Sequence, residues 1–449
     1  MRVLVFHGYM LRGTGSNIYN ASLAPALARL GHEVHLLSQD RGVELPGVHQ
    51  HVPEIGGLLP VYVKDPYEGF EVKAFPELSE AELERYLEAN VAAVREVAAG
   101  AGGIDLALAN HLVMGPVILA RAGVSPYAAK IHGSALEYTV KPHLERFGPL
   151  ALEGLAPANG VLVGSHHTAE SLWAALPELP ELEAKTRLGP PGVDLEEFRA
   201  APGPRPPLVV FVGKLIVSKG IDLLLAAWPL VRARHPQARL LVVGFGEWEE
   251  GVRRLLAALE RGDLDDAREI ARRGRGLEGG AEAPLPILAA FLADPPAGYA
   301  GLARAAAGSV ELVGRLEHDE VAALLPQAEA LVMPSTFPEA FGMVAAEAAA
   351  CGALPVSAGH SGMLEVSRQL AAALPPEVAC LTSFPVEPGA IEALAARLSG
   401  WFDLPEAERA AARASLVETV ARLWSWEGVA RGVLAAAAGD LGALPRPTA

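Results

Sequence analysis

Residues 330–352 read ALVMPSTFPEAFGMVAAEAAACG, and this stretch decides the fold. Residues 330–333 form a short apolar run that ends at Pro334, which predicts a buried strand. Residues 343–350 are rich in alanine and contain neither glycine nor proline, which predicts a helix that ends at Gly352. A buried strand followed directly by a helix is the building unit of a parallel α/β sheet.

Two carboxylates lie beside the start of this expected helix. Glu339 falls on the loop after the strand, and we expect Glu347 about two turns into the helix. Because a helix amino terminus has unpaired N–H groups and a partial positive charge, the backbone near Phe341 and Gly342 suits a phosphate. The carboxylates can accept hydrogen bonds from sugar and ribose hydroxyls. The alternative interpretation is an alanine-rich packing helix with two solvated glutamates.

The first half of the chain alternates apolar runs with helical stretches. The expected strands are residues 3–6, 33–37, 106–109, 128–131 and 160–163. The expected helices are residues 17–30, 80–99, 113–121 and 167–175. Such alternation predicts βαβ units and a doubly wound parallel sheet.

A proline-rich stretch at residues 201–207 marks the clearest domain boundary, so we expect domains at 1–200 and 207–423. The second series of expected strands is 208–212, 239–243, 310–312, 330–333, 353–356 and 378–381. Residues 250–308, approximately, are expected to be an insertion of one or two helices with a mobile loop. We expect deletions within it to leave nucleotide binding intact. A last helix, about 424–449, is expected to return to the first domain.

Composition narrows the classes of function. Apolar residues make up 51% and charged residues 20% of the chain, which is typical of a globular protein. The formal charge is −16 with an acidic surplus in both halves, which disfavours nucleic acid as a partner. Two cysteines are too few for a disulfide framework. No apolar run is long enough for a transmembrane helix, so we expect a cytoplasmic enzyme and leave homo-oligomerisation open.

Further motifs follow the expected strands. They are LRGTGSN at 11–17, KIHGS at 130–134, VGKLIVSKG at 212–220, VGFG at 243–246 and VGRL at 313–316. Glycines at such turns let backbone N–H groups approach a phosphate closely. The first motif is not the dinucleotide fingerprint, because Ile18 stands where the third glycine belongs. Plain turns, a structural histidine and solvated lysines are the alternative interpretations.

Together these motifs resemble those of the retaining GT-B glycosyltransferases of family 4, whose E-x7-E signature matches Glu339 and Glu347. The resemblance spans nearly the whole chain and is weakest in residues 40–100 and 247–309. It implies an α/β protein with two Rossmann-like, doubly wound parallel-sheet domains that face each other across a cleft. The second domain is then the one that binds a nucleotide sugar.

The resemblance also implies a role for each matching residue. The catalytic set is His132, which would contact the donor sugar, Lys214 and Lys219, which would hold the diphosphate, and Glu339, which would hold sugar hydroxyls. The family usually has arginine where Lys214 stands, so the charge is kept but the bidentate phosphate geometry is lost. The implied donor-binding set is Gly15, Gly213, Gly244, Arg315, Ala340, Phe341, Gly342, Met343, Val344 and Glu347.

The implied activity is transfer of a hexose from a nucleotide diphosphate sugar, with retention at the anomeric carbon. The implied acceptor is a small molecule, a glycan or a lipid-linked molecule. No Asp-x-Asp pair suited to a metal–diphosphate bridge is evident, so we expect neither a metal nor a cofactor. A sugar-nucleotide epimerase of similar architecture and a non-catalytic nucleotide-sugar-binding protein are the alternatives. An NAD-dependent oxidoreductase is disfavoured because no dinucleotide fingerprint follows a strand.

Overall fold

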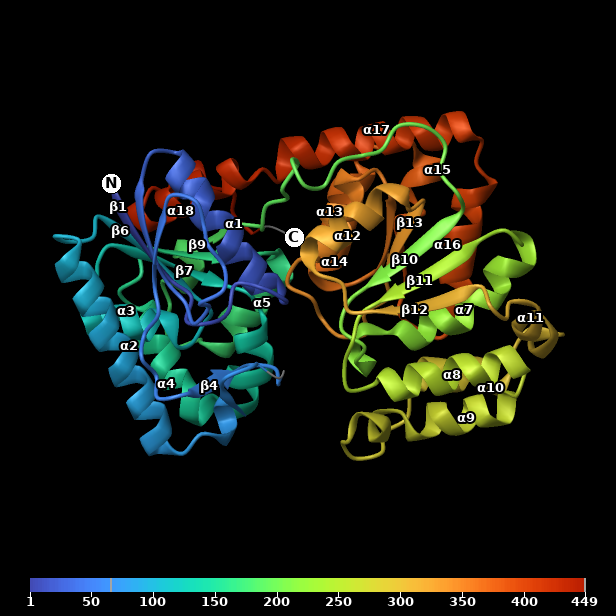
Figure 1. Cartoon of the computed structure of the whole chain (residues 1–449), viewed down its shortest axis with the longest axis horizontal. Coiled ribbons are helices and arrows are strands. Elements are labelled where there is room, and N and C mark those ends of the chain that lie inside the picture. The colour runs from blue at the N-terminus through green and yellow to red at the C-terminus, as the bar shows by residue number, and fades with distance from the viewer. Residues whose placement is uncertain (65–66, 448–449) are drawn as a thin grey trace. The chain divides into compact units, whose positions relative to one another are not determined.

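The computed structural model describes residues 1–64 and 67–447 of the chain. It divides into two compact units (Figure 1). The first unit comprises Met1–Gly192 together with Trp424–Ala449, and the second comprises Val193–Leu423. The division therefore falls before residues 193–200, which the sequence analysis grouped with the first domain. The last helix, expected over about 424–449, spans Trp426–Ala438 and ends where Gly439 adopts the left-handed conformation; residues 448–449 lie outside the described residues.

The first unit is built on a parallel sheet, which among the described residues has seven strands in the order β3-β2-β1-β6-β7-β8-β9. These strands are β1 (Arg2–Phe6), β2 (Glu33–Leu37), β3 (Val48–His51), β6 (Leu106–Asn110), β7 (Tyr127–Ile131), β8 (Gly160–Val163) and β9 (Thr186–Leu188). A separate small sheet pairs β4 (Leu58–Val61) with β5 (Glu71–Ala74). The strand order reverses direction at β1 and β6, which is where open α/β sheets bind ligands.

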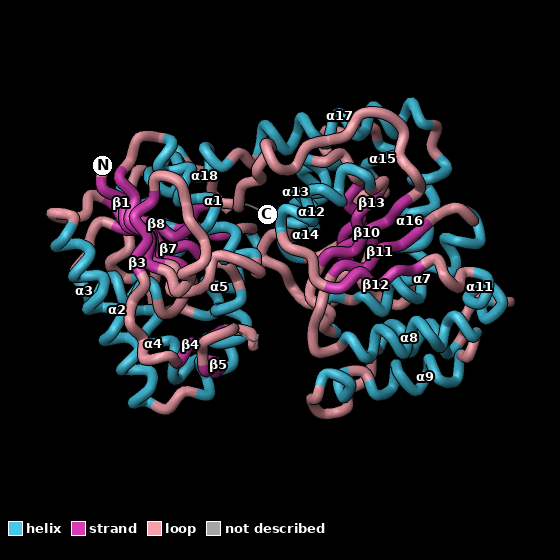
Figure 2. The backbone as a smooth tube through the Cα atoms, in the orientation of Figure 1, coloured by secondary structure: helices cyan, strands magenta, loops and turns pink. Residues whose placement is uncertain are grey.

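Helices cover both faces of this sheet (Figure 2). They are α1 (Gly15–Arg29), α2 (Glu80–Gly100), α3 (Gly115–Ala122), α4 (Leu144–Leu155), α5 (His166–Ala175), α6 (Leu182–Lys185) and α18 (Trp426–Ala438). Because successive side chains of a strand point to opposite faces, Val3 and Val5 pack with α1 and α18, whereas Leu4 and Phe6 pack with α2, α3 and α4. Helix α18 thus completes the core of a unit that is otherwise formed by the start of the chain.

The second unit has a parallel sheet of six described strands in the order β12-β11-β10-β13-β14-β15. These strands are β10 (Leu208–Val212), β11 (Arg239–Val243), β12 (Val310–Gly314), β13 (Ala330–Met333), β14 (Leu354–Ala358) and β15 (Ser383–Phe384). Here the order reverses at β10 and β13. The loops that follow these two strands are therefore the expected ligand-binding loops of this unit.

The helices of the second unit include those of the insertion. They are α7 (Ile221–Arg234), α8 (Glu249–Arg261), α9 (Leu264–Arg273), α10 (Pro286–Ala293), α11 (Tyr299–Ala305), α12 (His318–Leu324), α13 (Met343–Ala350), α14 (Ser361–Ala371), α15 (Pro376–Ala379), α16 (Ala390–Asp403) and α17 (Glu406–Leu423). No described helix is both long enough and apolar enough to cross a bilayer.

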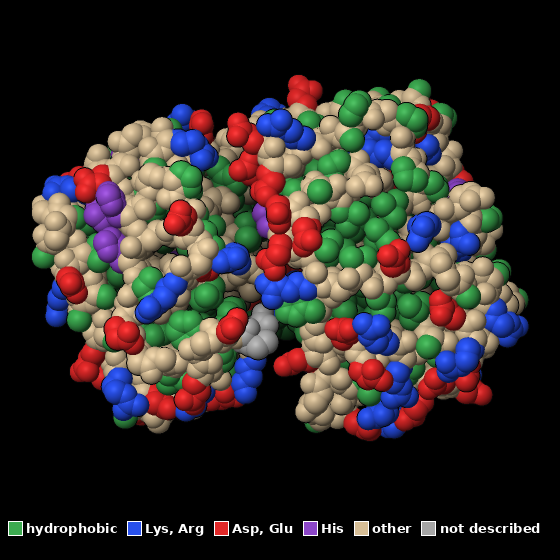
Figure 3. All heavy atoms as spheres, viewed as in Figure 1, with side chains coloured by type: hydrophobic (Ala, Val, Ile, Leu, Met, Phe, Trp, Pro, Cys, Tyr) green, Lys and Arg blue, Asp and Glu red, His purple; other side chains and the backbone are tan. Residues whose placement is uncertain are grey.

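Two sequence-based expectations about this unit are wrong. Residues 378–381 were expected to be a strand, but Pro376 is the first residue of the short helix α15, and the strand β15 begins later, at Ser383. The insertion was expected to hold one or two helices with a loop, but four described helices, α8, α9, α10 and α11, lie between residues 249 and 305. Ion pairs between their charged side chains cover the outer surface of α8 and α9 (Figure 3).

Candidate functional site

The loops after β10 and β13 lie in direct contact, at the point where the strand order of the second sheet reverses. The backbone N–H of Thr336 donates to the carbonyl of Ser218 at 2.9 Å. Gly220 packs so closely that a Cβ there would come within 2.0 Å of the Pro334 carbonyl oxygen. Glycine is therefore required at this position, and the close packing brings the lysine-bearing loop against the loop that carries Glu339.

Lys219 and Glu339 form an ion pair across these two loops. The Lys219 ammonium donates to Oε1 of Glu339, and the Ser335 hydroxyl donates to the same oxygen at 3.0 Å. Both charged side chains are partly exposed, at 28% for Lys219 and 24% for Glu339. An incoming anion can reach the ammonium group, and an incoming hydroxyl can reach the carboxylate. The structure thus brings these two sequence-predicted residues together.

Glu347 lies on α13 in a buried position. It is the fifth residue of that helix, a little over one turn from its start, whereas the sequence analysis expected about two turns. Its 5% exposure raises the pKa of the carboxyl group to about 7. His318, at the start of α12, places Nε2 4.0 Å from Oε1 of Glu347 and 3.6 Å from Glu197.

His318 was missed by the sequence analysis. It stands two residues after the VGRL motif, and a histidine at a helix start beside a predicted ligand loop is a signal that could have been used. Phe198 packs edge-on against it, with ring centroids 5.0 Å apart. This contact and the Glu197 ion pair explain why residues 193–200 belong to the second unit.

The loops after β10, β11 and β12 are joined by backbone hydrogen bonds. The N–H of Gly213 donates to Val243, and that of Gly244 donates to Gly314 at 2.8 Å. A Cβ on Gly244 would come within 1.9 Å of the Gly213 carbonyl oxygen, so glycine is needed there too. Lys214, directly after Gly213, is partly exposed on this surface. The three strand ends thus form one continuous glycine-rich edge.

Arg315 lies on this edge with its guanidinium 5.1 Å from the centroid of the Phe245 ring. Its Nε also donates to Glu317 at 3.0 Å. Phe245 was not among the predicted residues, although it stands inside the VGFG motif. The stacked pair offers a planar cationic surface, which suits a nucleobase or a phosphate.

The start of α13 presents backbone groups to the same edge. Phe341 is buried, whereas Ala340, Gly342, Met343 and Val344 are partly exposed. Because the first N–H groups of a helix have no partner inside it, this partly exposed turn can donate to an anion. Lys219 and the helix start thus supply positive charge on the loops after adjacent strands.

One contact comes from the insertion. The Glu278 carboxylate accepts a hydrogen bond from the backbone N–H of Val217, on the loop that carries Lys219. The Trp248 indole donates to the carbonyl of Gly274 at 3.1 Å and fixes the segment that precedes Glu278. The insertion therefore contacts a predicted phosphate-binding loop, a contact that the sequence analysis did not predict.

The first unit carries the other predicted residues, Gly15 and His132, on segments that follow β1 and β7 of its own sheet. Gly15 is the first residue of α1, and His132 follows β7. Polar side chains connect the two regions: His132 Nε2 lies 2.8 Å from Asn110 Oδ1, and the Asn110 amide donates to Asn20 Oδ1 at 2.8 Å. Asn20 in turn lies 3.0 Å from Nδ1 of His7.

Hydrogen-bond directions in this network fix the imidazole tautomers. The Asn110 amide nitrogen donates to Phe6 and Asn20, so its oxygen is the acceptor for a proton on Nε2 of His132. The neutral ring of His132 therefore presents Nδ1 as an acceptor. Burial also lowers the pKa of His132 well below its ordinary value, which keeps the ring neutral. The sequence analysis singled out His132 but none of its partners.

His111 packs against this network in a strained conformation. Its φ is +68°, and its ring lies 4.9 Å from that of His132 and 4.6 Å from that of Tyr62. Both ring nitrogens are buried without a hydrogen-bond partner among the described residues. Burial lowers the pKa of His111 well below its ordinary value, so the ring is neutral. Strain and unsatisfied polar atoms together are typical of functional sites.

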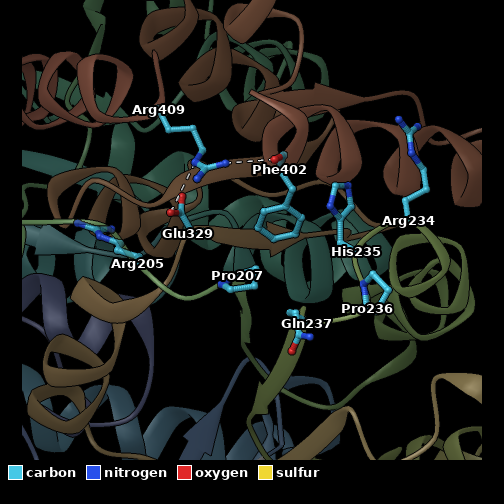
Figure 4. Close-up of a pocket in the computed structure, with 9 residues that line it drawn as sticks. All are labelled: Arg205, Pro207, Arg234, His235, Pro236, Gln237, Glu329, Phe402 and Arg409. Atoms are coloured by element: carbon cyan, nitrogen blue, oxygen red, sulfur yellow. Dashed lines mark hydrogen bonds and ion pairs between the residues drawn. The ribbon is translucent and has the colours of Figure 1, made fainter. Parts of the chain in front are cut away.

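A cavity of about 340 Å³ lies at the amino-terminal ends of the strands of the second sheet (Figure 4). Pro207, Gln237 and Glu329 lie in it just before β10, β11 and β13, whereas the candidate site follows the strands. Burial raises the pKa of Glu329, which accepts a hydrogen bond from the Trp401 indole at 3.0 Å and pairs with Arg409 and Arg413. These contacts anchor α16 and α17, so we assign the cavity a structural role.

Known protein families match this chain over most of its length. Residues 13–197 match the family described as Glycosyltransferase Family 4. Residues 206–272 and 302–416 match families described as Glycosyl transferases group 1. These ranges contain every candidate site residue of both units.

Two curated relatives are similar over most of their own length. A D-inositol 3-phosphate glycosyltransferase of Segniliparus rotundus is 29% identical over 94% of this chain and 83% of the relative. A GDP-mannose-dependent mannosyltransferase of Corynebacterium glutamicum, which acts on a monoacylated phosphatidylinositol monomannoside, is 26% identical over 68% of each chain.

Solved structures share the fold at lower identity. Sucrose-phosphate synthase from Thermosynechococcus elongatus aligns with a TM-score of 0.60 at 22% identity, covering 96% of this chain and 97% of that one. The Anabaena protein HepE, solved with UDP and glucose, aligns with a TM-score of 0.62 at 17% identity, covering 99% of this chain and 100% of that one. The likeness extends across both units.

Proposed function

Because this chain belongs to the GT-B glycosyltransferases of family 4, we propose that it transfers a hexose from a nucleotide diphosphate sugar with retention at the anomeric carbon. The observation that carries this proposal is the Lys219–Glu339 ion pair beside the start of α13, with Glu347 buried on the same helix. A cation for phosphate, a carboxylate for sugar hydroxyls and a buried acceptor for ribose lie in one unit.

Charge stabilisation is the main task of such a site. When the bond between the sugar and the diphosphate breaks, negative charge grows on the leaving group. Lys214, Lys219 and the first N–H groups of α13 are positive groups that stabilise this charge in the transition state more than in the ground state. We propose that they do so without a metal ion or a cofactor.

The remaining residues orient the two substrates. Glu339 accepts hydrogen bonds from sugar hydroxyls, and Glu347 accepts them from the ribose. In the first unit, Nδ1 of His132 accepts a hydrogen bond from the donor sugar, as its neutral tautomer allows. Transfer by front-face substitution, with the departing phosphate accepting the acceptor proton, needs no nucleophile from the protein.

The names of the relatives indicate which acceptors to test first. Each name mentions an inositol compound: inositol 3-phosphate in the first relative, and a phosphatidylinositol lipid in the second. We therefore propose a hydroxylated acceptor of this kind, handled in the cytoplasm. The proposed mechanism works equally for a monomer and for a homo-oligomer.

The test has two stages. Nucleotide sugars are first screened for thermal stabilisation of the protein, because a ligand that binds the folded state raises its melting temperature. The stabilising donor is then incubated with inositol 3-phosphate, phosphatidylinositol or a glucan, and the anomeric configuration of the product is read by NMR. Conversion of the donor alone into an epimer would instead identify an epimerase. Inverted product would contradict retention.

A further inference from the structure

A closed circuit of hydrogen bonds surrounds Glu339. The backbone N–H of Glu339 donates to Oγ of Ser361 at 3.0 Å, and this oxygen lies 3.2 Å from Nδ1 of His360. Nε2 of His360 lies 2.8 Å from the carbonyl oxygen of Ser335. The hydroxyl of Ser335 donates to Oε1 of Glu339 at 3.0 Å and closes the circuit.

The chemistry of these groups fixes the direction of each bond. A carbonyl oxygen can only accept, so Nε2 of His360 carries a proton and donates to Ser335. With Nε2 as the protonated ring nitrogen, Nδ1 accepts a hydrogen bond from the Ser361 hydroxyl. Ser361 Oγ meanwhile accepts from the Glu339 backbone. Each donor meets an acceptor, so the circuit holds both the backbone and one carboxylate oxygen of Glu339.

The backbone conformation of Ser361 is one that serine rarely adopts. This first residue of α14 has φ at +52°, in the left-handed region that glycine adopts far more readily than serine. Serine therefore strains the backbone there relative to glycine. The hydroxyl, with its bonds to Glu339 and His360, is what glycine could not supply.

The circuit also determines which part of Glu339 is left for a ligand. The described contacts of the carboxylate, from Lys219 and Ser335, both go to Oε1. Oε2 accepts no hydrogen bond from the described residues. A carboxylate held in this way presents one oxygen in a fixed direction.

We propose that Ser361 and His360 are positioning residues that aim Oε2 of Glu339 at a hydroxyl of the donor sugar. This inference rests on the proposed function, because it requires a nucleotide sugar in the site. The two residues act through Glu339 and do not themselves touch the reacting atoms. Loss of either residue should therefore weaken binding of the nucleotide sugar and leave the affinity for the nucleoside diphosphate unchanged.

Two variants of Ser361 separate this role from backbone stability. Ser361→Gly and Ser361→Ala both remove the hydroxyl, but glycine relieves the positive φ and alanine keeps it. We expect both variants to bind the preferred nucleotide sugar about tenfold more weakly than the wild type, the effect of one lost hydrogen bond. Binding of the matching nucleoside diphosphate should change less than about twofold. Ser361→Gly should melt at a higher temperature than Ser361→Ala.

Calorimetric titration with UDP, GDP, UDP-glucose and GDP-mannose provides the affinities. A wild-type protein that binds none of the four, and no other nucleotide sugar in the thermal screen, would overturn the proposed function and this inference with it. Wild-type binding of a nucleotide sugar that Ser361→Gly leaves unchanged would overturn the positioning role alone. If Ser361→Ala lost affinity and Ser361→Gly did not, the serine would matter only through its backbone conformation. This result would also overturn the positioning role.

A double-mutant cycle tests whether the effect passes through Glu339. In a Glu339→Ala background, Ser361→Gly should produce no further loss of nucleotide-sugar affinity, because the group that it positions is absent. An equal loss in both backgrounds would contradict the proposal. His360→Ala should reproduce the Ser361 effect at a smaller size, since the bond from Glu339 to Ser361 remains.

Discussion

Glu347 is buried, and its proposed role is to hold the ribose. Because burial changes the pKa of its carboxyl group, the stability of the protein should depend on pH. Burial raises its pKa to about 7 in the folded protein, against 4.5 for an exposed glutamate. Between these values the folded state binds more protons than the unfolded state, so the free energy of unfolding decreases as pH rises. The Glu347 contribution to this decrease is about 3 kcal/mol.

Glu347→Gln should remove this dependence, because the amide does not titrate. We expect urea unfolding at pH 5 to give similar stabilities for the two proteins, and at pH 8 to give a more stable variant. The difference between the proteins isolates Glu347 from histidines such as His7, whose lowered pKa of about 4 makes stability rise with pH. A difference that stays constant from pH 5 to 8 would show that Glu347 is ionised throughout.

Lys219 is the residue on which the proposed charge stabilisation depends most. Lys219→Ala should reduce kcat by about 10²-fold with a smaller change in KM, because the leaving-group charge is largest in the transition state. Lys214→Arg, which keeps a cation on the same loop, serves as the matched variant and should remain active. Steady-state kinetics with the identified donor checks both. A change in KM alone for Lys219→Ala would limit that residue to ground-state binding.

Asn110 governs the tautomer of His132 in the first unit. Asn110→Ala should allow both neutral tautomers of His132, which imidazole ¹⁵N shifts distinguish, whereas the wild type shows only the Nε2–H form. Asn159→Ala is the control, because Asn159 bonds to Ala437 in the same unit and does not contact His132. A single Nε2–H tautomer in Asn110→Ala would show that another group fixes the ring.

Glycines and charged residues directly after apolar runs could be found from sequence, because parallel strands end at one edge and the loops there meet. The partners of these residues could not. His318, Phe245 and Asn110 are distant in sequence from the residues that they contact, and only the packed sheet brings them close. The structure therefore gives the positions of the candidate residues and their partners. The roles of these residues stay predictions.

At the scale of elements, the insertion influences the site through one side chain. Glu278 holds the Val217 N–H, so Glu278→Ala should loosen the loop that carries Lys219 and weaken nucleoside diphosphate binding several-fold, the effect of one lost hydrogen bond. Glu269→Ala is the matched control, since its ion pair with Arg272 stays within α9. Equal affinities of the two variants, measured by calorimetry, would restore the expectation that the insertion is dispensable for nucleotide binding.

Fully buried elements were predicted more accurately than half-exposed ones. The strand and helix of residues 330–352 form β13 and α13 as expected, because both are buried and uninterrupted. In contrast, β3 reads VHQH and is only partly buried, so it carries no apolar pattern to detect. The short apolar stretch at 378–381 is compatible with a strand or a helix. Pro376, two residues before it, favours the first turn of a helix, and the helix α15 forms there.

At the scale of the whole molecule, the second unit is one continuous segment, Val193–Leu423. We expect this fragment alone to unfold cooperatively and to bind the same nucleoside diphosphate as the full chain, because the proposed ribose and phosphate contacts lie within it. A fragment of residues 1–192 should not fold cooperatively, since Trp426, Ala430 and Val433 are missing from its core. Circular dichroism melting and calorimetry check both. A cooperative transition in the shorter fragment would show that α18 is dispensable.

The return of α18 to the first unit also determines the order in which a nascent chain matures. Residues 1–192 emerge from the ribosome early, yet the part of their sheet that α18 covers stays exposed until Trp426–Ala438 has been synthesised. Translation of the intervening segment, at roughly 5–20 residues per second, lasts on the order of 10–50 s. The second unit completes its core during that time. Maturation therefore runs from the middle of the chain outward, and the exposed face of the first sheet is where a chaperone would bind on the ribosome.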